Sequence, residues 1–444
     1  MRIDRHTLKD LEIFKSDENT TTVFDLIDKT KTAGGNYRLR EMFLNPPETF
    51  RELVIQQEAV KYFTEPDNYG DFIPQYSSHQ MRSFEEYLSS NINVVENGNL
   101  ITCARFCIVD IEAYRYLKNS LRDIIDFVFG FNKIFIITGS EIPVLLRDAR
   151  NEIINLMDDP DFRSATRLKE NRRFLFLKVL QSDRIMRTRL KNTLANILKW
   201  YYEIDALLSM AKVTVECKFQ FPEIIDKESS IFNAEGLFHP LLQNPVPCNV
   251  SLNKDSNFIF LTGPNMAGKT TFLKAAGTAV YMAHLGMGIP VKCAKISYFD
   301  RLFTSLNVTD SISTGYSFFY SEVLRVKQLA ESLKNGEKTF SLFDELFRGT
   351  NVKDAYDASL MIISGLVKWN DSVFILSSHL WELLEKIKVY PNIKEFCFES
   401  EIVNGTPVFS YHLKPGISDM RLGITIIKNE KILELLNSVK NDKN

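Results

Sequence analysis

Two kinds of hydrophobic pattern divide the chain near residue 215. Before that point, apolar residues recur at spacings of three and four in segments 22–47 and 51–66, and both segments end at prolines. This spacing is typical of helices that bury one face. Few residues interrupt the pattern over 160–208, which predicts one or two long helices. We therefore expect an all-α domain over 1–215.

After about residue 225 the pattern changes to short apolar runs that alternate with helix-like segments. The runs NFIFLTG, TFSLFDE, SVFILSSH and EFCFES have the length and the β-favouring content of buried strands. Strands that alternate with helices indicate an α/β domain around a largely parallel central sheet. We expect this domain to cover 216–444, with a polar linker around Pro222 before the first strand.

Composition agrees with a multidomain globular protein. The 444 residues are 45% hydrophobic and 25% charged. The formal net charge is −2, so the overall charge does not indicate nucleic-acid binding. Charge is sorted locally, however, because residues 161–199 hold eleven Lys or Arg against three Asp or Glu. This stretch is either a solvated helix face or a surface for a phosphate backbone or an acidic partner.

Several observations bear on location. The charged start MRIDRHTLKD does not resemble a signal peptide. The apolar run 127–146 is interrupted by glycine, proline and charge, so we interpret it as a buried helix or helical hairpin and expect no membrane span. The six cysteines are scattered and are interpreted as buried free thiols. These features favour a reducing, cytoplasmic setting.

The segment FIFLTGPNMAGKTTFLK carries the first candidate chemistry. Residues 263–270 match the pattern G-x-x-x-x-G-K-[ST] between a strand-like run and a helix-like run. Glycines let backbone N–H groups point at phosphates, and the helix N-terminus adds partial positive charge. Lys269 is then expected to reach the β- and γ-phosphates, and the Thr270 hydroxyl to hold Mg²⁺.

Two further strand ends complete the candidate site. One run ends in Asp344-Glu345, where the first carboxylate is suited to place Mg²⁺ and the second to polarise an attacking water. Paired acids favour hydrolysis over transfer to a small acceptor. Another run ends in Ser377-Ser378-His379, which puts a histidine on the rim of the sheet where ligands bind. This histidine is either a γ-phosphate sensor or a satisfied structural residue.

Together these motifs resemble the MutS family of DNA mismatch-repair ATPases, within the ABC ATPase class. The quoted segments are GPNMAGKTTFLK, DELFRGTNVKDA, SSHLWEL, AEGLFHPLL and YFDRLFTSLNVTDSISTGYSFFYSEV. A weaker resemblance to the family's helical core and lever domain begins with TTVFDLIDKTKTAGGNYRLREMFLNPP. The chain resembles a truncated form, because the family's N-terminal mismatch-recognition and connector domains are not seen ahead of the core.

The resemblance implies specific roles. Thr270 and Asp344 place Mg²⁺, Glu345 activates water and His379 senses the γ-phosphate. Ser317 reaches the nucleotide of the opposite subunit, so the resemblance implies a homodimer with composite sites. Asp354 lies in a loop along that interface. The phosphates of ATP are bound by Gly263, Pro264, Asn265, Met266, Ala267, Gly268, Lys269, Thr270 and Thr271.

The resemblance also implies departures and leaves alternatives open. Val246 stands in place of an aromatic that packs on adenine, and Leu346-Phe347 replaces a smaller pair after the acids. The first hypothesis is an ATP-dependent DNA-binding protein in mismatch repair or recombination, which binds DNA by shape or backbone. The alternative is a nucleotide-dependent module that uses the same ATPase on a protein partner.

Overall fold

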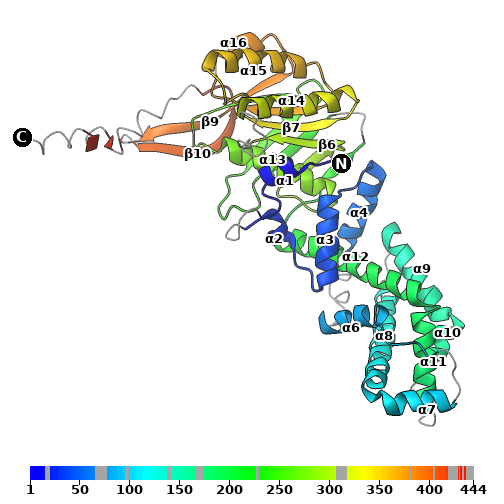
Figure 1. The fold of residues 1–444 in the computed structure, drawn as a ribbon. Helices are drawn as coiled ribbons and strands as arrows, with labels where there is room; N and C mark the ends of the chain where they lie inside the picture. The colour runs from blue at the N-terminus through cyan, green and yellow to red at the C-terminus, as the bar shows by residue number, and fades with distance from the viewer. Residues whose placement is uncertain are drawn as a thin grey trace, which may run out of the picture. The chain divides into compact units, whose positions relative to one another are not determined.

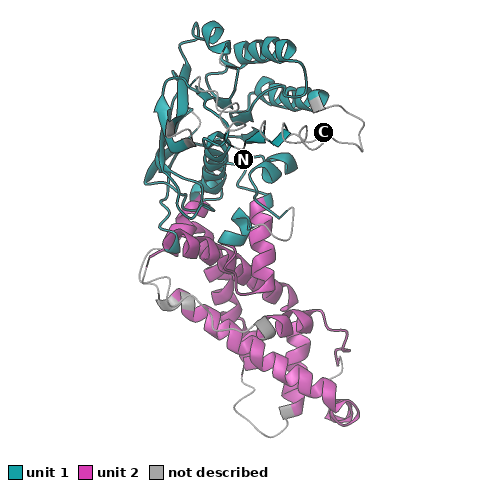
Figure 2. Cartoon of the chain, turned by 90° about the vertical axis from the view of Figure 1, so that its left-hand side faces the viewer, with its two compact units in different colours: residues 1–26, 44–54, 216–444 teal, residues 27–43, 55–215 magenta. Residues whose placement is uncertain are grey.

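The computed structural model divides the chain into two compact units, which Figure 2 shows in teal (unit 1) and magenta (unit 2). Unit 1 contains residues 1–26, 44–54 and 216–444, and unit 2 contains residues 27–43 and 55–215. The structure describes residues 1–15, 21–65, 78–95, 100–137, 142–166, 175–226, 230–306, 318–380, 382–403, 406–418, 429, 431–432 and 435–436.

Unit 2 is helical in its described part, so the predicted helical N-terminal region is confirmed. Its core forms where rings from three helices meet: Tyr201 packs edge-on against Phe127 and Phe131, and Phe84 packs edge-on against Phe127. The helices of this region (Figure 1) are α3 (Ala33–Leu44), α4 (Phe50–Tyr62), α6 (Ser78–Leu88), α7 (Leu100–Val109), α8 (Ile111–Ile137), α9 (Val144–Asp158), α10 (Pro160–Thr166), α11 (Leu175–Arg187) and α12 (Lys191–Glu216).

The structure bears on two expectations: one or two long helices over 160–208, and a buried helix or helical hairpin over 127–146. The segment 160–208 falls into α10, α11 and the first part of α12, with a break between Arg187 and Lys191. The start of the apolar run 127–146 forms the end of α8, where Phe127, Phe131 and Phe135 are buried. Among the described residues, no helix is long and apolar enough to cross a membrane.

The described residues of unit 1 form two sheets, and the larger one positions the candidate site. Its six strands lie in the order β10-β9-β4-β8-β7-β6; β4, β6, β7, β8 and β9 are parallel, and β10 pairs with β9 in the antiparallel sense. The α/β prediction with a largely parallel sheet is therefore confirmed. These strands are β4 (Phe258–Thr262), β6 (Arg301–Ser305), β7 (Thr339–Asp344), β8 (Val373–Ser377), β9 (Ile393–Val403) and β10 (Thr406–Pro415).

A smaller, mixed sheet has the order β1-β5-β2-β3 and was not predicted as a separate layer. Helix α13 lies against both sheets, because it contacts β6, β7 and β8 as well as β2. Figure 1 shows α14, α15 and α16 gathered on the other face of the large sheet. Further elements of the unit are β1 (Glu223–Ile225), β2 (Phe232–Leu237), β3 (Cys248–Leu252), β5 (Cys293–Ser297), α13 (Lys269–His284), α14 (Phe318–Lys334), α15 (Val352–Leu366) and α16 (Leu383–Ile387).

The N-terminal segment contains α1 (Arg5–Asp10) and α2 (Val23–Ile27) and is grouped with the α/β part of the chain. The boundary at 215/216 is a passage between the units, but residues 1–26 and 44–54 belong to the α/β unit. Polar contacts hold the first residues against the α/β unit. Asp4 Oδ2 accepts from Arg325 Nη1 (2.6 Å), and Asp10 Oδ2 accepts from Thr304 Oγ1 (2.7 Å). Hydrophobic periodicity could not reveal these long-range partners.

A buried histidine ends α13 and ties it to the chain that precedes β6. The N–H of Phe299 donates to His284 Nε2 (2.9 Å), so Nδ1 carries the proton and donates to the Val280 carbonyl oxygen (2.8 Å). The ring is therefore held in its neutral form. Burial lowers the pKa of His284 from 6.5 to about 3.

We predict that acid destabilises the protein partly through His284. Its pKa is lower in the folded state than in the unfolded state, so the neutral ring stabilises the fold fully above about pH 6.5, and this contribution falls as the pH drops toward 3. Between pH 7 and pH 5 the loss amounts to about 2 kcal/mol in the free energy of unfolding.

Urea unfolding of the wild type and His284→Gln over this pH range checks the prediction. The variant should be less stable at neutral pH but should show a shallower pH dependence. His412→Gln, at an exposed position, is the control and should keep the wild-type slope. Parallel slopes for the wild type and His284→Gln would contradict the assignment.

Candidate functional site

The candidate site forms where three neighbouring strands of the large sheet end. Strand β8 lies between β4 and β7, and Ser377 at its end is in register with Leu261 of β4 and with Asp344 of β7. All three strands are parallel, so their carboxyl ends lie at one edge of the sheet. Segments that lie far apart in the chain therefore place their polar residues together.

A glycine loop, residues 263–268, connects β4 to α13 and needs unusual backbone angles. Gly263 has φ of 143°, Gly268 has φ of 105°, and Met266 has φ of 70°. A Cβ atom on Gly263 would lie 3.1 Å from the Phe398 carbonyl oxygen, and one on Gly268 would lie 3.3 Å from the Tyr411 ring. The two glycines are thus required both by conformation and by space.

Lys269 begins α13 and turns its side chain back over the glycine loop. Its ammonium donates to the carbonyl oxygens of Gly263 (2.7 Å) and Pro264 (3.0 Å), and lies 3.4 Å from His379 Nε2. The residue is only 6% exposed. Burial lowers its pKa, while Glu345 and Asp344 oppose that effect. A buried cation therefore lies at the base of the loop.

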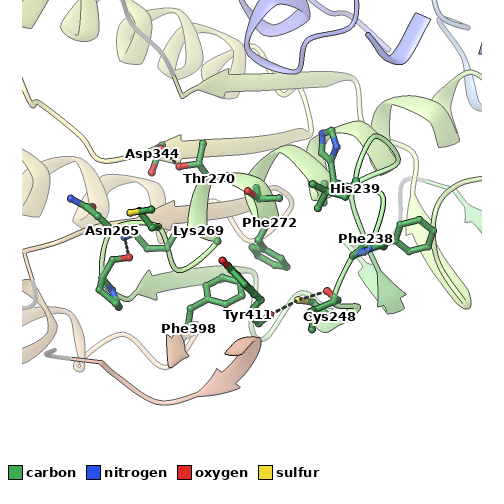
Figure 3. A pocket seen from close by; sticks show the side chains of 18 of the residues that line it. Phe238, His239, Cys248, Asn265, Lys269, Thr270, Phe272, Asp344, Phe398 and Tyr411 are labelled. Atoms are coloured by element: carbon green, nitrogen blue, oxygen red, sulfur yellow. Dashed lines mark hydrogen bonds between the residues drawn. The ribbon is translucent and has the colours of Figure 1, made fainter. Parts of the chain in front are cut away.

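A hydroxyl and a carboxylate meet beside this lysine, as Figure 3 shows for Thr270 and Asp344. Thr270 Oγ1 donates to Asp344 Oδ2 (2.7 Å), and the Ser377 hydroxyl donates to Asp344 Oδ1. Asp344 is buried at the end of β7. The pair offers two hard oxygen atoms, which is the donor type that Mg²⁺ prefers.

Glu345 projects next to this pair and has two cationic or polar neighbours. Its Oε1 lies 2.8 Å from His379 Nε2, and its Oε2 lies 3.0 Å from Arg348 Nε. Burial would raise the pKa of Glu345, but the contacts with His379 and Arg348 outweigh it and hold the pKa below that of an ordinary glutamate. Glu345 is therefore ionised at neutral pH and is able to accept a proton.

These groups line a pocket of about 730 Å³ within unit 1. Figure 3 shows Phe238 and Cys248 on the side of the pocket far from Asp344. The pocket thus has a charged end and a more apolar end. Its lining includes Leu237, Phe238, His239, Leu242, Asn244, Pro245, Val246, Cys248, Pro264, Asn265, Met266, Gly268, Lys269, Thr270, Thr271, Phe272, Ala275, Asp344, Glu345, Arg348, His379, Phe398 and Tyr411.

Most of the residues singled out in the sequence lie together here. Gly263 and Ala267 shape the loop but do not line the pocket. Ser317 lies outside the described residues. Asp354 is exposed in the first turn of α15, where its N–H donates to the Asn351 side chain (2.9 Å) and helps to cap the helix.

Sequence reasoning missed three lining residues with clear contacts. Arg348 was part of the quoted block DELFRGT, but no role was assigned to it. Tyr411 and Phe398 come from the hairpin β9–β10, whose return to the glycine loop has no local sequence signal. Tyr411 combines a left-handed backbone (φ 55°) with partial exposure, and it lies at an irregularity of the β10 register.

Within the basic stretch 161–199, Arg187 differs from the exposed surface charge that was expected. Arg187 is buried, and its guanidinium pairs with Asp183 and donates to Ser90 Oγ (3.1 Å). Arg189 pairs with Asp159 and Asp161. The segment 167–174, which holds Arg172 and Arg173, lies outside the described residues. Arg187 is therefore a structural residue of unit 2 and does not provide a free surface charge.

The cysteines also differ from the prediction. None of the six forms a disulfide, but only Cys103, Cys248 and Cys397 are buried, whereas Cys293 is exposed. Among the residues that the structure describes, no group of three or more His, Cys, Asp or Glu side chains is arranged to hold a metal ion. A metal at Thr270 and Asp344 would need further ligands from a bound molecule or from water.

The family model of MutS domain V matches residues 259–440, which include the glycine loop, Asp344, Glu345 and His379. This part of the chain is therefore similar to MutS domain V. The resemblance to MutS proposed from the motifs is thereby confirmed.

Curated relatives with the name DNA mismatch repair protein MutS match longer segments. The protein of Ehrlichia ruminantium (strain Gardel) is 32% identical over 229 residues, which cover 51% of this chain and 28% of the relative. That of Bacillus velezensis is 28% identical over 324 residues, or 67% of this chain and 36% of the relative. That of Persephonella marina is 29% identical over 267 residues, or 58% and 30%. The chain thus spans about a third of the length of these relatives.

The glycine loop gives a direct test of the backbone argument. We predict that Gly268→Ala lowers the free energy of unfolding by about 1–3 kcal/mol, because alanine is strained at φ of 105° and its Cβ meets Tyr411. Chemical denaturation measures the change.

Gly365→Ala in α15 is the matched control. A Cβ atom at Gly365 meets nothing within 4 Å. Alanine also has the higher helix propensity, so this variant should be unchanged or up to about 1 kcal/mol more stable. Equal destabilisation by the two substitutions would show that the special conformation of Gly268 does not matter.

Proposed function

We propose that the chain is an ATPase of the MutS type, which hydrolyses ATP at composite sites between two copies and uses the cycle to act on DNA. The observation that supports it best is the convergence of Lys269, the Thr270–Asp344 pair and Glu345–His379 on one pocket. They supply a cation, a pair of oxygen donors for a metal ion and an ionised base, which are the groups that phosphoanhydride hydrolysis requires.

The glycine loop and Lys269 would bind the phosphates of ATP. Lys269 already holds its ammonium against two carbonyl oxygens, and phosphate oxygens are stronger partners for a buried cation. The loop precedes the N-terminus of α13, a 16-residue helix whose first N–H groups favour an anion. The affinity for phosphate therefore has both a charge and a dipole source.

The Thr270 hydroxyl and the Asp344 carboxylate fit Mg²⁺, together with phosphate oxygens and water. When bound, the ion would neutralise charge on the β- and γ-phosphates. Ser377 donates to the other Asp344 oxygen and keeps the carboxylate oriented.

Glu345 would orient and deprotonate the attacking water. It is ionised at neutral pH, and its neighbours Arg348 and His379 fix both of its oxygens. His379 is close to both Glu345 and Lys269, so it is well placed to respond when the γ-phosphate leaves.

The apolar end of the pocket would hold the nucleobase. Val246 and Tyr411 line it, and the Tyr411 ring offers a stacking surface that valine does not.

A second copy would complete each site. Met266 is apolar and lines the pocket, yet it is 73% exposed, and a partner subunit would cover such a residue. The family resemblance assigns the contribution in trans to Ser317. ATP would favour the closed pair and hydrolysis would release it. Four covalent connections join unit 1 to unit 2, at 26/27, 43/44, 54/55 and 215/216, and would pass the change to the helical unit.

A second candidate function is a nucleotide-dependent module that acts on a protein partner. Two observations favour it: Arg187 and Arg189 are engaged by acids within unit 2, and α7 exposes Ile101 (79%), Ile108 (81%) and Val109 (77%). Large exposed aliphatic side chains on one helix are typical of protein contact surfaces rather than of DNA contact surfaces.

We predict that Glu345→Gln lowers the kcat for ATP hydrolysis at least about 100-fold, because the amide cannot accept the proton of water. The amide keeps the size of the side chain, so ATP binding should persist. A phosphate-release assay gives kcat, and a fluorescent ATP analogue reports binding. Glu385→Gln, an exposed position on α16, is the control. Undiminished turnover in Glu345→Gln would exclude the proposed base.

The choice between DNA and protein as the target follows from the same assay with duplex, mismatched, branched and single-stranded DNA. We predict that at least one DNA structure changes kcat, and that its binding weakens steeply with salt because phosphates are contacted. Turnover that is indifferent to every DNA would favour the protein-interaction alternative.

A further inference from the structure

Glu322 is a buried carboxylate that the proposed mechanism does not use. It lies behind the turn of residues 345–349, which carries Glu345 and Arg348. Glu322, on α14, is 3% exposed. Its Oε1 accepts from the N–H of Phe347 (3.2 Å), and its Oε2 accepts from the N–H of Gly349 (3.5 Å). Burial raises the pKa of Glu322, although N–H groups of the turn oppose this effect. An uncompensated carboxylate is costly in such a place, so its contacts need an explanation.

The turn that it holds, residues 345–349, has a strained backbone. Glu345 has φ of 60° and Phe347 has φ of 61°, although neither is glycine. Each such residue costs on the order of 1–3 kcal/mol and persists only where its surroundings hold it. The Glu322 carboxylate accepts hydrogen bonds from the residues on either side of Arg348. It therefore holds the part of the turn that directs Arg348 toward Glu345.

Other contacts hold the two ends of the turn and the Phe347 side chain, but they do not accept from the N–H groups in the middle of the turn. The Glu345 N–H donates to the Ser377 carbonyl oxygen (3.0 Å), and Arg348 Nη2 donates to the Asp344 carbonyl oxygen (2.6 Å). The Phe347 ring packs against Phe319 with centroids 5.6 Å apart. Glu322 is the acceptor that the structure gives for the N–H groups of Phe347 and Gly349.

Helix α14 is itself held in place, so Glu322 presents its carboxylate from a fixed support. Arg325, three residues further along, is buried, and its Nε donates to the Thr304 carbonyl oxygen (2.9 Å). Its Nη atoms bond to Asp4 and to Thr7 Oγ1 (2.9 Å), and its guanidinium lies over the Phe303 ring. Positions three apart share a helix face, so the same face that is anchored carries Glu322.

We propose that Glu322 is a positioning residue for the ATPase site: it holds the strained 345–349 turn so that Glu345 and Arg348 face the pocket. The inference deepens the proposed ATPase function and rests on it. Removal of the carboxylate frees two N–H groups and lets the turn relax, which moves Glu345 relative to the attacking water. A displacement of about 1 Å at a catalytic group costs up to roughly 100-fold in rate.

The test compares Glu322→Ala and Glu322→Gln with Glu331→Gln, an exposed position on the same helix. For Glu322→Ala we expect the kcat for ATP to fall at least about 10-fold while the KM for ATP stays within about twofold, because the phosphate contacts of the glycine loop are untouched. Glu322→Gln keeps one acceptor oxygen and should lie between Glu322→Ala and the wild type. Glu331→Gln should match the wild type.

Amide hydrogen exchange over 345–350 provides a readout that does not depend on turnover. The amides of Phe347 and Gly349 should exchange faster in Glu322→Ala than in Glu331→Gln, while the strands β7 and β8 keep their protection. If Glu322→Ala lowers the stability of the whole unit, Glu322→Gln is used for the same comparison.

The outcomes separate the two proposals. A wild-type protein without ATP turnover would refute the proposed function, and the exchange rates alone would then decide whether Glu322 holds the turn. Normal turnover with an inactive Glu345→Gln supports the proposed function. In that case, unchanged kcat and unchanged exchange in both Glu322 variants would overturn the inference, as would a uniform loss of protection throughout unit 1.

Discussion

The pairing of β8 with both β4 and β7 is the constraint on which the site depends. It places Ser377 beside Leu261 on one side and beside Asp344 on the other, so that one carboxylate bonds to a serine from β8 and to a threonine from the helix after β4. Side chains alternate between the faces of a sheet, so a slip of one residue would turn Asp344 toward the opposite face. The glycine loop, the acids and the histidine would then no longer share a pocket.

The candidate site also depends on the balance of charge among its side chains. Lys269, Asp344, Glu345, Arg348 and His379 lie within one partly buried cluster, and each has at least one neighbour of opposite or complementary character. An unpaired charge in such a place would destabilise the fold, whereas a paired charge is tolerated. A paired charge is also able to exchange its partner when a ligand binds more strongly. In the proposed cycle, triphosphate binding exchanges the internal partners of Lys269 and Thr270 for phosphate and metal. The helix α14 and its Glu322 would keep the neighbouring turn in place during that exchange.

Much of the site was predictable because it is built from short local patterns. A buried run before Gly263, a helix-forming run after Lys269, and acids or histidine directly after two other buried runs all describe strand ends, and parallel strands collect such ends at one edge. Arg187 shows where local reasoning fails. Its charge suggested a binding surface, but Asp183 lies one helical turn before it and Tyr87 lies beneath it, so the guanidinium is buried. The sign of a side chain's charge can be read from the sequence, whereas the residue that pairs with it cannot.

The sequence by itself determined the α/β class of the C-terminal part, the glycine loop and the order of the candidate catalytic residues, because these depend on periodicity and on residues close together in the chain. Only the tertiary structure decided which distant segments cooperate. The first residues join the α/β unit through Asp4 and Asp10, the hairpin β9–β10 returns Tyr411 to the glycine loop, and α14 brings Glu322 behind the 345–349 turn. Each of these contacts joins residues at least 25 positions apart, as in the case of Glu322 and Phe347, and the partner is chosen by complementarity of shape and charge in the folded chain.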